Sequence, residues 1–146
     1  MEKEKLHKQI HNITELSNIL TTLVNNPALF DTDVTRELFI RYVTAVQDHL
    51  KKTDAALYAE LLDHSSAHKH KVVNLFISGS KEIKRIFSDY TKKWCDQPKY
   101  RLRMSNYGQF QAETMEMFDL VLRRLQDETE RLYPLIGDYD KTDNAA

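Results

Sequence analysis

The chain has 146 residues, of which 41% are hydrophobic and 29% charged, and its net charge is −1. This is the composition of an ordinary globular protein with one domain, and the balanced charge favours neither direct nucleic-acid binding nor an anionic membrane surface. No run of about 18 apolar residues is present, so no membrane-spanning segment is predicted, and the single cysteine excludes an internal disulfide and fits a cytoplasmic location.

The first half of the chain predicts two helices. Apolar residues at three- and four-residue spacing run through residues 2–25, which is the pattern of one helix face. Asn25, Asn26 and Pro27 then predict a turn, because the residue before proline avoids the helical conformation. Thr32 or Asp33 is a suitable N-cap for a second helix that extends to about residue 64.

The second half predicts two more helices. A third helix follows the polar break at residues 63–71, with Ser65 or Ser66 as a candidate cap, and ends near Trp94. Residues 94–108 are predicted to form a loop. The last helix begins near Tyr107 and ends near Ile136, with Gly137 as a candidate C-cap.

Four amphipathic helices with short connections predict an all-α protein, an up-down-up-down four-helix bundle. A single helix would leave its apolar stripe exposed to water. We therefore expect the four stripes to pack together into one core. The predicted domain covers residues 1–137, and residues 138–146 form a frayed tail.

A carboxylate interrupts the apolar stripe of the last helix. Glu128 lies between Leu125 and Leu132, where a helix facing a core normally carries an apolar residue. Arg124 lies one turn earlier and can pair with it, and His49 occupies a similar place on the second helix. Three interpretations stay open for Glu128: half of a buried ion pair with Arg124, a residue at the edge of the stripe, or a metal ligand.

Other features indicate a binding protein rather than an enzyme. The sequence has no glycine-rich phosphate loop and no arrangement of nucleophile and base, so no catalytic residue is predicted. Residues 81–103 are rich in Lys and Arg, and residues 113–140 are rich in Asp and Glu. An acidic face suits a basic protein partner, and the candidate contacts on it are Asp119, Asp127 and Glu130.

The chain resembles the hemerythrin-like (HHE cation-binding) family of helical bundles. The stretches "HLKKTDAALYAEL" at 49–61 and "RLQDETERLYPLI" at 124–136 look like the motif that family carries on its second and fourth helices. The resemblance implies a hemerythrin-like bundle in which iron or another divalent metal is bound. The positions that match metal ligands are His7, His49, His70 and Glu128, whereas Thr53 and Arg124 replace ligands, for which Asp54, His11 or His68 are possible substitutes.

The chain also resembles the bacterial regulator-of-sigma-D family of anti-sigma proteins. "QDHLKKTDAALYAELL" at 47–62, "IFSDY" at 86–90 and "RLQDE" at 124–128 are similar to segments of that family, with Arg124 and Glu128 in the same places. This resemblance implies a protein without a cofactor that binds the primary sigma factor of RNA polymerase. Since two metal ligands are replaced while Arg124 and Glu128 are kept, we expect a metal-free, anti-sigma-like regulatory protein, with hemerythrin-like metal binding as the alternative.

Overall fold

The computed structural model describes residues 2–61, 67–96, 101–102 and 107–135. Four long helices run through these residues: α1 (Glu2–Val24), α2 (Asp33–Leu61), α3 (Ala67–Trp94) and α4 (Tyr107–Asp127). The last of these continues without a break into a π-helical segment, η2 (Glu128–Leu132). None of the described helices is both long and apolar enough to cross a membrane.

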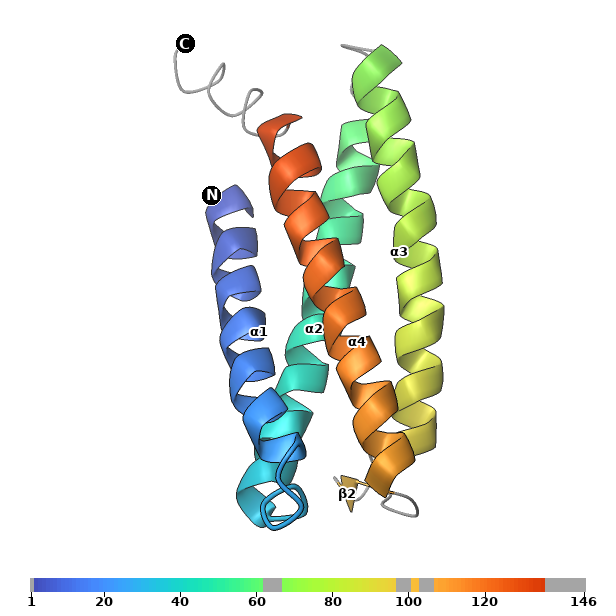
Figure 1. The fold of residues 1–146 in the computed structure, drawn as a ribbon. Helices are drawn as coiled ribbons and strands as arrows, with labels where there is room; N and C mark the ends of the chain where they lie inside the picture. The colour runs from blue at the N-terminus through green and yellow to red at the C-terminus, as the bar shows by residue number, and fades with distance from the viewer. Residues whose placement is uncertain (1, 62–66, 97–100, 103–106, 136–146) are drawn as a thin grey trace.

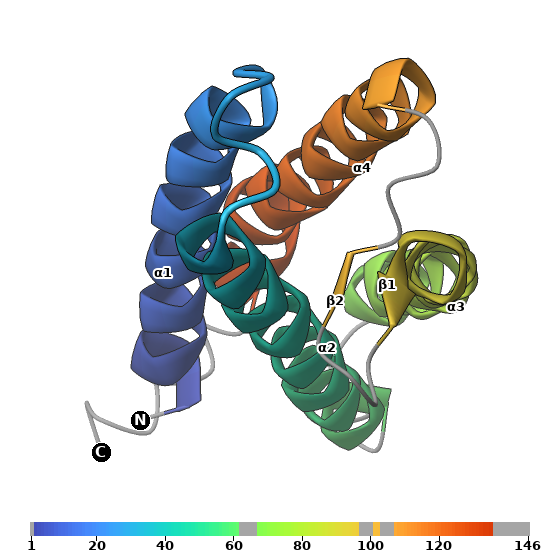
Figure 2. The same ribbon diagram turned by 90° about the horizontal axis from the view of Figure 1, so that it is seen from below.

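The helices alternate in direction, so the predicted up-down-up-down four-helix bundle is confirmed (Figure 1). The start of α1 lies at the same end as η2, and the connection between α1 and α2 lies at the other end (Figure 1). Seen along its length, the bundle has α1 and α2 side by side, and α3 lies on the far side of α2 from α1 (Figure 2).

The predicted N-cap of α2 forms at Thr32. Its hydroxyl oxygen accepts a hydrogen bond from the backbone N–H of Thr35 at 3.2 Å, which satisfies one of the free N–H groups at the helix start. The hydroxyl of Thr35 in turn donates to the carbonyl of Leu29 at 2.8 Å. The connection between α1 and α2 is therefore held by side chains that the sequence supplies locally.

The segment that was predicted to be a loop contains a short antiparallel strand pair. Strand β1 (Cys95–Asp96) pairs with β2 (Arg101–Leu102), with Cys95 opposite Leu102. Two residues are too few to show the alternating apolar pattern of a strand, so these strands could not be predicted from the sequence. The candidate caps Ser65, Ser66 and Gly137 and the predicted tail 138–146 lie outside the described residues.

The apolar core has two parts. The larger cluster fills the half of the bundle near the connection between α1 and α2 and includes Phe39, Phe110 and Phe118. The smaller cluster lies toward the other end and includes Leu57 and Leu132. Ile10 packs against both clusters. The polar residues described next lie at the edge of the larger cluster, where His49 precedes Leu50 and Arg124 precedes Leu125, and in the sequence intervals that lead to Leu57 and Leu132.

Candidate functional site

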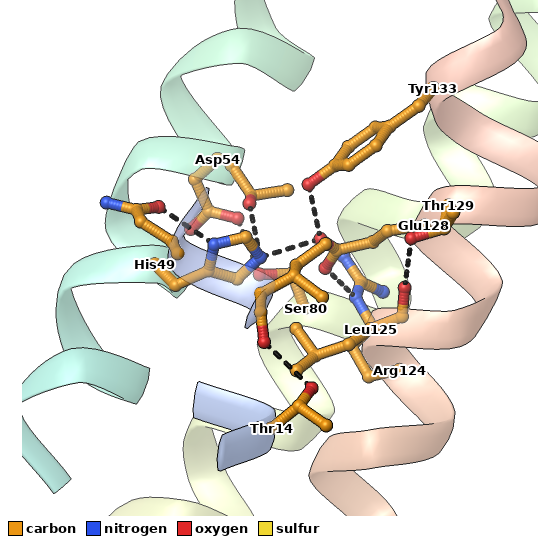
Figure 3. A network of polar contacts seen from close by, with 12 residues as sticks. Thr14, His49, Asp54, Ser80, Arg124, Leu125, Glu128, Thr129 and Tyr133 are labelled. Atoms are coloured by element: carbon orange, nitrogen blue, oxygen red, sulfur yellow. Dashed lines mark hydrogen bonds and ion pairs between the residues drawn. The ribbon is translucent and has the colours of Figure 1, made fainter. Parts of the chain in front are cut away.

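A buried polar network lies between the helices (Figure 3). His49 and Thr53 come from α2, Arg124 comes from α4, and Glu128 lies at the start of η2. The side chains of His49 and Glu128 are 1% and 0% exposed. A fully buried carboxylate is rare unless it is paired, so its partners decide what the site can do.

Both carboxylate oxygens of Glu128 have hydrogen-bond donors. Oε2 accepts from Arg124 Nε at 2.9 Å. Oε1 lies 2.8 Å from His49 Nε2 and accepts from the Tyr133 hydroxyl at 3.1 Å. Glu128 is thus the centre of the network (Figure 3), and it is not an edge residue of the helix.

The contacts of His49 fix the orientation of its ring. Gln9 Nε2 donates to the carboxylate of Asp48 at 3.0 Å, which turns Gln9 Oε1 toward His49 Nδ1 at 2.9 Å. Each ring nitrogen of His49 therefore faces an oxygen of another helix, Gln9 Oε1 at Nδ1 and the Glu128 carboxylate at Nε2. Thr53 Oγ1 is 3.3 Å from Nε2 and is a second acceptor there.

Arg124 is enclosed by α3. Its guanidinium lies over the ring of Phe76, with 4.8 Å between the guanidinium carbon and the ring centroid, which is a favourable cation–π distance. A Cβ added at Gly79 would lie 2.9 Å from Arg124 Nη1, so the absence of a side chain at Gly79 makes room for the cation. Arg124 Nη2 is buried and has no hydrogen-bond partner among the described residues.

The π-helical turn brings Tyr133 to Glu128. The backbone N–H of Tyr133 donates to the Glu128 carbonyl, which is the five-residue spacing of a π-turn, and the side-chain hydroxyl donates to the same residue. In an α-helix, residues five apart lie about 140° apart around the axis and do not share a face. Pro134 explains the interruption, since proline has no N–H and its ring clashes with the carbonyl four residues earlier.

The charges in the network hold Glu128 ionised. Burial is the largest single effect and raises its pKa, but the hydrogen bond and charge of His49, together with those of Arg124, outweigh burial and lower the pKa below the ordinary 4.5. Burial and the nearby Glu128 carboxylate raise the pKa of Tyr133 above its ordinary value of 10. The Tyr133 phenol therefore stays protonated and remains a donor.

Of the four residues that matched metal ligands, the structure joins His49 and Glu128. The ring of His7 lies edge-on to Tyr133, with 4.9 Å between the ring centroids, so it covers the network from outside. His70 lies in the first turns of α3 and lines a shallow hollow formed with other residues of α3.

The three possible substitute ligands are engaged elsewhere or exposed. Asp54 accepts a hydrogen bond from Ser80 at 2.5 Å and pairs with Lys84, so it joins α2 to α3. His11 is exposed and pairs with Glu15 on the same helix. His68 is exposed at the start of α3.

The donor set at the centre does not fit a di-iron site. Such a site in a helical bundle requires several carboxylates and histidines that point inward together. Here, within the described parts of the chain, no three His, Cys, Asp or Glu side chains are grouped closely enough to hold a metal ion. The guanidinium of Arg124 is a permanent cation and cannot be a ligand, and it pairs with the carboxylate that a metal would need.

The candidate partner contacts lie on the surface. Asp119, Asp127 and Glu130 are all exposed. Asp119 pairs with Arg123 at 2.8 Å, and Glu130 accepts a hydrogen bond from Gln126 at 3.0 Å. At helical spacing these three acidic residues share one face of the last helix, together with Glu116.

The basic stretch 81–103 is largely paired where its side chains are described. Lys84 pairs with Asp54, Arg85 with Glu82 and Lys93 with Glu113. The side chains of residues 95–103 lie outside the described part of the chain. The described basic side chains of this stretch therefore mainly form ion pairs within the chain.

Comparisons with protein-family models, with curated proteins and with solved structures gave no match.

The network also contains residues that sequence reasoning missed. These residues are Gln9 and Tyr133, which are hydrogen-bonded members of it. Gln9 lies next to the apolar Ile10, so its position gave no signal. Tyr133 follows Glu128 by five residues, a spacing that brings two side chains together in a π-turn but not in an α-helix. Gly79 did have a sequence signal, because a lone glycine inside a helical stretch indicates close packing or a kink, and here it makes room for Arg124.

Proposed function

We propose that this chain is a non-enzymatic cytoplasmic regulator that binds a basic protein module. Its role would be that of the anti-sigma proteins it resembles, with the primary sigma factor of RNA polymerase as partner. The observation that carries the proposal is the contact between Arg124 and Glu128, at 2.9 Å and buried. These two residues match the regulator-of-sigma-D segment, whereas Arg124 departs from the metal-binding motif.

The chemistry of the network supports a structural centre. Each oxygen of Glu128 already has a hydrogen-bond partner within the bundle, so the buried carboxylate needs no ligand to satisfy it. We expect a buried centre of this kind to favour one arrangement of the helices, while exposed residues bind the partner protein.

The surface of the last helix supports a basic partner. Asp119, Asp127 and Glu130 are exposed on one face. An acidic face accelerates association with a basic protein and discriminates against acidic ones.

The test is direct binding to the primary sigma factor of the same organism, measured by calorimetry in low salt. We expect binding at micromolar concentration that weakens as salt is raised, because the screening length falls from about 30 Å at 0.01 M to about 8 Å at 0.15 M salt. Reversing the charge of Asp119, Asp127 and Glu130 together should weaken binding.

The matched control reverses three acidic residues on other helices: Glu4, Glu15 and Glu37. This variant has the same net charge as the first triple variant and should bind like the wild type. If the wild-type protein does not bind the sigma factor at micromolar concentration in low salt, the proposal is wrong.

A further inference from the structure

A groove runs between the second half of α3 and the middle of α4. Its volume is about 520 Å³, and it lies on the side of the core formed by the larger apolar cluster. Ile86 and Leu120 form part of its floor, and both are only partly buried where they pack against that cluster. Tyr90 and Met117 complete the apolar floor.

The rim of the groove is acidic. Four carboxylates, those of Asp89, Glu113, Glu116 and Asp119, line it against two cations, Lys93 and Arg123.

Both cations are already paired within the chain. Lys93 contacts both oxygens of Glu113 at 2.9 Å, and Arg123 pairs with Asp119. The lining has four carboxylates and two cations over an apolar floor. Asp89 also pairs with Arg85, which lies outside the lining, at 3.6 Å, so the exposed Glu116 is the rim carboxylate without an ion-pair partner among the described residues.

We infer that this groove binds a basic amphipathic helix of a protein partner. The lining of α4 extends from Glu113 to Arg123, which is about 15 Å of helix. A partner helix of similar length would present apolar side chains at i, i+3, i+4 and i+7. These side chains would cover Ile86 and Leu120, and a Lys or Arg at the edge of the same helix would pair with Glu116.

The charge of the groove decides between partners. An acidic amphipathic helix would bring like charges together at the rim, which disfavours its binding. The biological role of this docking rests on the proposed function. The groove adds to that function the surface that is contacted and the kind of element that docks there. Its test does not require the sigma factor.

The probe is a fluorescent peptide of about 20 residues, long enough for the groove, with Leu on one helical face and Lys on the other. A second peptide has Glu in place of every Lys. Binding is followed by fluorescence anisotropy with the full chain, and the folding of each variant is checked by circular dichroism. We expect the Leu/Lys peptide to bind and the Leu/Glu peptide to bind at least about tenfold more weakly.

Three variants locate the contact. Glu116→Arg reverses an exposed charge on the rim, and Leu120→Gln makes the floor polar; each should weaken binding about tenfold or more. Glu4→Arg has the same charge change as Glu116→Arg but lies on α1, and it should bind like the wild type.

Three results would overturn the inference: no binding of the Leu/Lys peptide, equal binding of both peptides, or binding to Glu116→Arg that equals binding to Glu4→Arg. Sigma-factor binding that survives Glu116→Arg and Leu120→Gln would place that partner elsewhere and would also count against the groove. Failure of sigma-factor binding alone, with the peptide results as expected, would contradict the proposed function but not the groove.

Discussion

Glu128 is the residue around which the centre of the bundle is arranged. Its two oxygens accept from His49, Tyr133 and Arg124, so a carboxylate within the apolar stripe is compatible with a stable fold. The buried ion pair of Arg124 and Glu128 is not in itself evidence of extra stability, because both charges lose their hydration when they are buried. Removing one partner is costly, since the other charges then stay buried without compensation.

We expect Glu128→Gln to destabilise the protein by about 3–5 kcal/mol, the range found when one partner of a buried ion pair is removed. Urea unfolding at neutral pH measures the change. Glu130→Gln is the matched control, because Glu130 is exposed on the same segment, and its effect should be small. Equal stability of the two variants would contradict this account of the network.

The pH dependence of stability follows from the same residue. The pKa of Glu128 is lowered below 4.5 in the folded protein, so its contribution to stability is present above about pH 4.5 and is lost as the pH falls through the folded-state pKa. The difference in unfolding free energy between wild type and Glu128→Gln should therefore shrink toward acid. A difference that stays constant down to the acid transition would contradict the assigned ionisation.

Gly79 offers a test of the space around Arg124. Replacing glycine by alanine within a helix normally stabilises it by about 1 kcal/mol, but here the new Cβ would meet Arg124 Nη1 at 2.9 Å. We expect Gly79→Ala to give less than this gain in the wild type and the full gain when Arg124 is replaced by Met. Urea unfolding of the four proteins in this cycle measures the coupling, and additive effects would contradict the contact.

At the scale of elements, the π-helical turn η2 accounts for the contact between Tyr133 and Glu128. Its wider turn places Tyr133 on the same face as Glu128, so that backbone N–H and phenol both donate to one residue. π-Turns of this kind are often found at functional sites. Here the turn completes a polar network, and Pro134 supplies the local reason for it.

We expect Tyr133→Phe to destabilise the protein by about 1.5–3 kcal/mol, the range for a hydrogen bond to a charged group. Tyr42→Phe is the matched control: Tyr42 is also buried, but its hydroxyl has no hydrogen-bond partner among the described residues. The stability of Tyr42→Phe should equal or exceed that of the wild type. Equal losses in the two variants, measured by urea unfolding, would show that the Tyr133 hydroxyl has no special role.

At the scale of the whole molecule, the buried polar residues adjoin both apolar clusters of the core. The hemerythrin-like resemblance implies a metal ligand at position 124, but the residue there is Arg124, a cation that pairs with Glu128. Treatment with a chelator should therefore leave the melting temperature of the tag-free protein unchanged. Elemental mass spectrometry of the same sample should find no stoichiometric iron, manganese or zinc. A bound metal stabilises the folded state by mass action, so a lower melting temperature after chelation would contradict the assignment of Arg124.

The sequence by itself determined the four helices and the bundle, because the apolar spacing of each helix and the turn residues between them are local properties. It also narrowed Glu128 to three interpretations, since Arg124 lies one turn away on the same helix. The burial of His49, the role of Gln9 and the space at Gly79 were decided by tertiary structure, because each depends on a residue of another helix. The same holds for the groove between α3 and α4, whose floor and rim are formed by two helices that are adjacent only in the folded protein.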